Sequence, residues 1–134
     1  EIDDISFKIC NEHNIKQYYV RKSSDIAPTY KGEKRALEKI IRSQYKFPKS
    51  EKENGYVTIR FIVNCEGISG RFGIEEMDFS FKPRTFDKKI STQLVEIIKE
   101  LDGWTPRRNK VKSFDFYQYL TFKLKAGQII EILP

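Results

Sequence analysis

The chain has 134 residues and a formal net charge of +6, and 39% of its residues are hydrophobic and 33% charged. This length supports one hydrophobic core, so we expect a single domain over residues 1–134. The composition excludes a disordered chain, and no apolar run approaches the length of a membrane span. Because the sequence begins at Glu1 rather than Met, we expect a processed precursor or a trimmed chain whose targeting or anchoring segment is missing.

Residues 1–29 are predicted to be an N-terminal strand extension. One strand is expected around Phe7 and a second over residues 15–20, with a polar turn at His13 between them. A short helix over residues 12–19 fits the same pattern of polar and apolar residues. His13 is therefore expected to be a surface residue.

Two amphipathic helices are predicted from apolar residues at helical spacing. Residues 32–45 place their apolar side chains on one stripe, and Pro48 follows the end of this helix. The second helix is expected to be capped by Thr85 and to stop at residues 102–103. Trp104 comes next and is expected to fold back over the core.

The most regular strand pattern lies at residues 55–67, where apolar and polar residues alternate. We expect this stretch to be the central strand of the sheet. A second strand is predicted over residues 71–81, and its apolar residues change phase part-way. A bulge near residues 75–76 would keep Phe79 and Phe81 facing the core.

The C-terminal residues predict two further strands. Residues 114–125 alternate, with Tyr117, Tyr119 and Thr121 on one face, and a tight turn leads to a last strand over residues 128–133. The order predicts an α+β domain in which two helices pack on one face of an antiparallel β-sheet, with extra strands at the N- and C-termini.

Two cysteines, Cys10 and Cys65, leave two alternatives. They could form a disulfide, which would place the protein in an oxidising compartment, or they could be two buried free thiols. Together with the single histidine they are too few for a zinc site.

Basic residues are densest at residues 107–112 and 82–89. Such groups are typical of solvated loops. The alternative is a surface for an anionic partner, a polynucleotide or membrane headgroups.

The sequence contains no recognisable catalytic constellation. It has no Gly-rich phosphate loop, no His pair and no nucleophile elbow. Three acidic residues lie close together in the sequence, Glu75, Glu76 and Asp78. Neighbouring side chains of a strand point to opposite faces, so we expect these residues to be exposed strand charges. We therefore expect no catalytic residue, no cofactor and no metal, and a protein that is not an enzyme.

Several motifs, in this order and spacing, resemble the C-terminal domain of TonB, the energy transducer of Gram-negative bacteria. They lie at residues 30–32, 36–37, 45–48, 55–64, 67, 104–106 and 120–124. The inner-membrane helix and Pro-rich spacer that usually precede this domain are not in the sequence. The cysteine at position 65 and the additional strands are more similar to stand-alone, exported TonB-like proteins of the Bacteroidetes type. The resemblance implies a TonB-like core over about residues 30–124.

The resemblance also implies how such a domain would act. An extended peptide, for example a segment of an outer-membrane receptor, would add to the sheet edge formed by residues 116–124, lined by Tyr117, Tyr119 and Thr121. The alternative is that these tyrosines only cover the outer face of the sheet. A strand at residues 128–133 that pairs there would take this edge.

The leading hypothesis is a periplasmic or secreted, non-enzymatic domain that works through protein contacts in envelope transport, with no nucleic acid as partner. The alternatives are an exported structural or interaction protein without a role in energy transduction, and a basic nucleic-acid-binding domain. Strand exchange at the sheet edges would also permit a homodimer.

Overall fold

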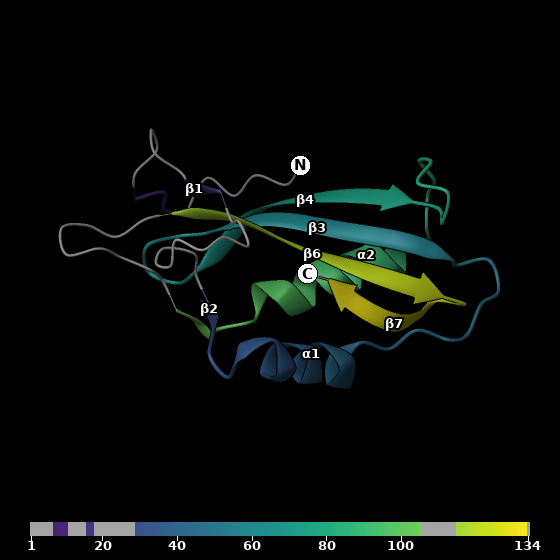
Figure 1. Ribbon diagram of the computed structural model, residues 1–134, viewed down its shortest axis with the longest axis horizontal. Helices are drawn as coiled ribbons and strands as arrows, with labels where there is room; N and C mark the ends of the chain where they lie inside the picture. Colours follow the sequence, from purple (N-terminus) through teal and green to yellow (C-terminus); the bar gives the residue numbers. More distant parts are fainter. Residues whose placement is uncertain (1–6, 11–15, 18–28, 106–114, 134) are drawn as a thin grey trace.

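The computed structural model describes residues 7–10, 16–17, 29–105 and 115–133 (Figure 1). Their elements, in chain order, are β1 (Lys16–Gln17), β2 (Thr29–Tyr30), α1 (Glu33–Gln44), β3 (Gly55–Val63), β4 (Ser69–Met77), α2 (Lys88–Lys99), β5 (Trp104–Thr105), β6 (Phe116–Lys125) and β7 (Gln128–Leu133). The described residues thus form an α+β structure, as predicted.

The main sheet has the strand order β1-β6-β3-β4, and β7 pairs with β6 beside β1. The pairs of β3 with β4, β3 with β6 and β6 with β7 are antiparallel, whereas β1 runs parallel to β6. β2 and β5 form a separate two-stranded antiparallel sheet. The strand predicted at residues 55–67 is therefore central, since β3 lies between β6 and β4.

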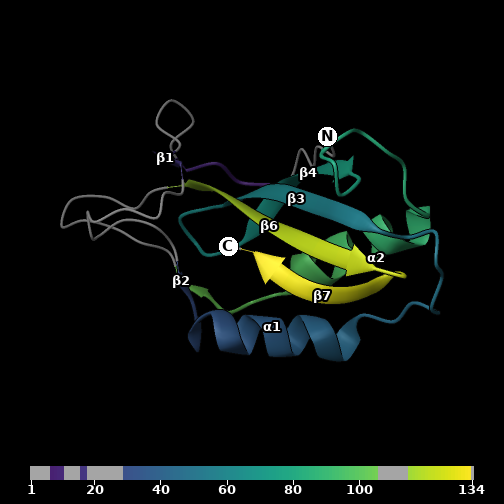
Figure 2. The same cartoon turned by 45° about the vertical axis from the view of Figure 1, so that its right-hand side comes forward.

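Both helices lie on one side of the sheet, and the opposite side carries no helix in the described part of the chain (Figures 1 and 2). The core lies between the helices and the sheet. Its largest fully buried side chains are Phe61, Phe72, Phe122, Ile41, Ile59, Ile90, Leu94, Ile98, Leu124 and Ile132. Alternation along β3 and β6 supplies the sheet half of this core, because every second side chain points toward the helices.

The second helix begins later than predicted. Asp87, rather than Thr85, is its N-cap, and its carboxylate accepts a hydrogen bond from the backbone N–H of Lys89 at 2.8 Å. The Thr85 carbonyl instead accepts a bond from the Arg84 guanidinium. Both Thr and Asp are favoured caps, so the sequence alone did not separate them.

β4 ends before two aromatic residues that were predicted to face the core. Phe79 and Phe81 are exposed, Phe81 to 68%. The chain leaves the sheet after Met77 because the Asp78 carboxylate accepts bonds from the N–H groups of Ser80 and Lys82, which closes a turn. The prediction of a continuous inward face over residues 71–81 is therefore wrong.

The predicted bulge is also misplaced. The register of β3 against β4 shifts between Arg60 and Ile62, opposite Gly70 and Gly73, and not near residues 75–76. Phase changes in apolar residues do not distinguish a bulge from the end of a strand, and here the strand ends.

Trp104 lies over the core as predicted and is only 6% exposed. Its ring makes an edge contact with Tyr30 at a centroid distance of 5.1 Å, and lies 5.7 Å from Phe61. Trp104 thus joins the small β2–β5 sheet to the core.

Several predictions concern residues outside the described part of the chain. These are most of the N-terminal strand pair, the turn at His13 and the basic residues 107–112.

Candidate binding surface

The side of the main sheet opposite the helices holds the residues predicted as a site. We call this surface the outer face. It is formed by alternate residues of β3 and β6, namely Tyr56, Thr58, Arg60, Ile62, Tyr117, Tyr119, Thr121 and Lys123. Antiparallel pairing places side chains that lie directly opposite each other on the same face.

The register brings the three predicted residues of β6 next to β3. Tyr117 lies opposite Ile62, and Tyr119 opposite Arg60. The hydroxyls of Thr121 and Thr58 share a hydrogen bond of 2.9 Å. Thr121 is thus engaged within the sheet, while Tyr117 and Tyr119 are 46% and 42% exposed.

The edge of β6, in contrast, is occupied along much of its length. β7 pairs with it from Thr121 to Lys125, and β1 pairs with it at Phe116 and Tyr117. β7 is held in turn by α1, because Arg42 donates a hydrogen bond of 2.9 Å to the Ile129 carbonyl. The predicted peptide-binding residues therefore lie on an inner strand rather than on a free edge.

One end of the outer face is covered by an N-terminal segment, residues 7–10. The Phe7 ring packs directly on Gly70, where a Cβ would come within 2.6 Å of Cε1. The Lys8 carbonyl accepts a bond of 2.9 Å from the Asn64 side chain, and the Lys8 ammonium pairs with Glu66 at 2.7 Å.

A disulfide between Cys10 and Cys65 ties this segment to the turn that follows β3. The Asp115 carboxylate accepts hydrogen bonds from the backbone N–H groups of both cysteines, at 3.1 and 3.2 Å. Cys10, Cys65 and Asp115 are the one group of three potential metal ligands in the described residues. Metal binding requires thiolates, which a disulfide does not offer.

The other end of the outer face is covered by aromatic rings. Phe81 stacks on Tyr56 at a centroid distance of 5.3 Å, and Phe79 meets the same ring edge-on at 5.5 Å. The Lys123 ammonium lies 5.7 Å from the Phe79 centroid. Tyr117, Tyr119 and Arg60 therefore occupy an open centre between two covered ends.

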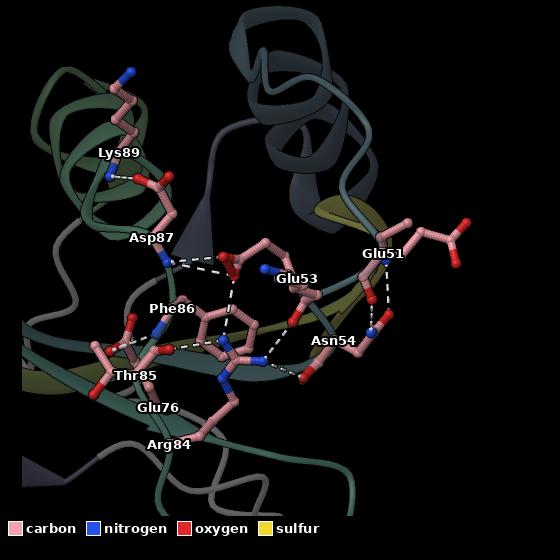
Figure 3. Close-up of polar contacts among 11 residues, drawn as sticks. Glu51, Glu53, Asn54, Glu76, Arg84, Thr85, Phe86, Asp87 and Lys89 are labelled. Atoms are coloured by element: carbon pink, nitrogen blue, oxygen red, sulfur yellow. Dashed lines mark hydrogen bonds and ion pairs between the residues drawn. The ribbon is translucent and has the colours of Figure 1, made fainter.

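A second polar cluster lies at the N-terminus of α2, on the helix side of the sheet (Figure 3). Arg84 is its hub. Its guanidinium donates to the carbonyls of Lys52 and Thr85 at 2.8 and 2.7 Å, pairs with the Glu53 carboxylate at 3.3 Å, and lies over the Phe86 ring. Since these donors are used internally, the cluster serves to hold the loop before β3 against α2.

Glu76 joins this cluster and was predicted to be an exposed strand charge. The structure places it partly buried, with its carboxylate 3.5 Å from the backbone N–H of Phe86. Burial raises the pKa of Glu76, and the Phe86 N–H and the Arg84 guanidinium act in the opposite direction. No sequence pattern indicated this, because the burial of Glu76 depends on the Arg84 loop folding back onto β4.

No known protein family, curated protein or solved structure compared with this chain matches it. In the described residues, no helix combines the length and apolar character needed to cross a membrane. Function must therefore be argued from the surfaces themselves.

Proposed function

We propose that the chain is a non-enzymatic binding domain that contacts a protein partner through the open centre of the outer face. The observation that carries this proposal is the exposure of Tyr117 and Tyr119 beside Arg60, in a sheet whose two ends are covered. Tyr and Arg are enriched in the central residues of protein interfaces, and a tyrosine offers a large contact area with few rotatable bonds.

The type of domain is part of the proposal. The order of α1, β3, β4, α2 and β6, with the two-residue β5 between α2 and β6, supports, together with the sequence motifs, a TonB C-terminal-like domain of the stand-alone, exported kind. The disulfide supports a periplasmic or secreted location, since disulfides persist in oxidising compartments. The partner would then be an extended protein segment, such as part of an outer-membrane receptor.

Contact through the outer face is favoured over strand addition at β6. A peptide that pairs with β6 over Thr121–Lys125 must displace β7. Ile132 of β7 is 1% exposed, and exposing such a side chain costs about 1.5 to 3 kcal/mol. Binding across the outer face involves no such cost.

Strand addition at β4 is a second candidate. One edge of β4 pairs with β3, and among the described residues the other edge makes only an isolated bridge between Met77 and Pro83. The bulge opposite Arg60 twists this edge and disfavours a regular added strand.

Amide chemical shifts test the proposal. The protein is titrated with a synthetic peptide from the N-terminal segment of an outer-membrane receptor of the same organism. We expect shifts at β3 and β6, and their loss in Tyr119→Ser but not in Lys39→Ser, which changes an exposed residue of α1. Shifts along β4 alone would favour strand addition there. Shifts confined to α1 and α2, or none at millimolar peptide, would overturn the proposal.

A further inference from the structure

A pocket of about 300 Å³ opens on the outer face where β3 and β4 change register. One residue of β3, Phe61, here faces two residues of β4, because Arg60 pairs with Gly73 and Ile62 with Gly70. The additional residue bends β4. The residues that line the pocket are Arg60, Phe61, Ile62, Arg71, Gly73, Ile74 and Tyr117.

Of the described residues that line this pocket, two contribute guanidinium groups and none contributes a carboxylate. Arg60 lies across Gly73, and a Cβ at position 73 would be in ordinary van der Waals contact with its Nη2, at 3.6 Å. Arg71 has a φ of 55° in the bulge. Within the described part of the chain, neither arginine has an acidic partner at ion-pair distance.

Two arginines at one concave site, neither paired with an acidic group among the described residues, are suited to an anion. A guanidinium binds a carboxylate through two parallel hydrogen bonds, and such charge-assisted bonds are about twice as strong as neutral ones. Tyr117, 46% exposed at the rim, can pack on the apolar part of whatever carries the anion.

The surroundings favour a single acidic group over a polyanion. Binding of a polynucleotide requires cations that follow its phosphates. Along β4 the next exposed charge after the pocket is acidic, Glu75, and on β3 the next outer-face residue is the neutral Thr58. Along these two strands, therefore, the positive charge does not continue directly beyond the pocket.

We propose that this pocket binds the carboxylate of an Asp or Glu side chain on the partner protein. This inference rests on the proposed function, since the pocket adjoins the open centre of the outer face. The acidic side chain would fix the position of the partner on the sheet, while Tyr117 and Tyr119 supply contact area.

Peptide display on the full chain provides the test. Random short peptides are selected on the wild-type protein, and those whose binding is lost in Tyr119→Ser are retained as outer-face ligands. We expect an Asp or Glu at one fixed position among them. The affinity of one such peptide, and of its form with Glu replaced by Gln, is then measured for the wild type and for Arg60→Gln/Arg71→Gln.

Replacing Glu by Gln in the peptide, or using Arg60→Gln/Arg71→Gln, is expected to weaken binding by about tenfold or more. Combining the modified peptide with this variant should weaken binding no further, because both changes remove the same contact. The matched control, Arg35→Gln/Lys39→Gln, removes two exposed charges from α1 and should leave the affinity unchanged. Arg60→Lys, which keeps the charge but loses the planar fork, should lose part of the affinity. Melting temperatures establish that each variant is folded.

Three outcomes would overturn the inference. Outer-face peptides without an acidic preference would remove the pocket assignment and leave the proposed function intact. A single-stranded oligonucleotide that binds more tightly than the peptides, and is weakened by Arg60→Gln/Arg71→Gln, would identify phosphate as the ligand. A failure to select any outer-face peptide would remove both the inference and the proposed function.

Discussion

Removing the disulfide is expected to lower the free energy of unfolding by about 4 kcal/mol. Cys10 and Cys65 are separated by 55 positions, and the entropy of closing a loop of that length in the unfolded chain corresponds to about 4 kcal/mol at 25 °C. The Asp115 carboxylate reinforces this closure in the folded state, since it binds the backbone N–H groups of both cysteines.

Urea unfolding of the wild type and of Cys10→Ser/Cys65→Ser, each with and without reductant, measures this effect. Reductant should destabilise the wild type to the level of the double variant and should not affect the variant itself. If the free energies of unfolding of the oxidised wild type and the double variant differ by less than about 1 kcal/mol, the reasoning is refuted, because the disulfide would then not restrict the unfolded chain.

Further predictions concern the core, a partly buried carboxyl group and two glycines. Trp104→Ala should cost about 3 to 5 kcal/mol of stability in urea unfolding, because it empties a buried site; a cost under about 1 kcal/mol would contradict that packing. Glu76 has a raised pKa in the folded state, so its contribution to stability is fully present below the unfolded pKa and is lost as the pH rises through the folded value. The free energy of unfolding of Glu76→Gln should therefore rise relative to that of the wild type as the pH increases from about 4 to about 7. If the difference between the two proteins does not change with pH, Glu76 is not buried as described. Gly55→Ala should cost about 1 to 3 kcal/mol, since Gly55 has a φ of 140° and a Cβ there would overlap the Met77 carbonyl oxygen. The matched change Gly73→Ala meets only ordinary contacts and should be neutral or stabilising by up to about 1 kcal/mol; equal costs at both glycines would contradict this difference.

Local patterns predicted the regular elements well. The apolar stripe of residues 32–45 became α1, and the alternation from residue 55 became β3, because both signals arise from the period of the element itself. The burial of Trp104 could also be predicted, since a large aromatic ring directly after an amphipathic helix lies close to the core.

The failures concern a helix cap, a local turn and the way a loop folds back onto the sheet. Phe79 and Phe81 fit the strand period, but the turn at Asp78 ends the strand before them. Their rings therefore pack on Tyr56 and not in the core. The burial of Glu76 depends on the loop that carries Arg84 and Phe86, which follows β4 and folds back onto it.

The pocket could not be predicted for a similar reason. Arg60 and Arg71 lie eleven positions apart, and only the register shift between β3 and β4 brings them to one site. Tyr117 and Tyr119 were found by alternation, but the face they share with Arg60 follows from the pairing of β6 with β3.

The central claim is that the open centre of the outer face binds a protein segment. Its most direct test is the dissociation constant of the receptor-segment peptide for the wild type, for Tyr117→Ser/Tyr119→Ser and for the α1 control Lys39→Ser. Because central aromatic residues of an interface contribute about 2 kcal/mol or more, we expect the tyrosine variant to bind at least about 30-fold more weakly and the control to bind like the wild type. An unchanged dissociation constant for a folded tyrosine variant would contradict the claim.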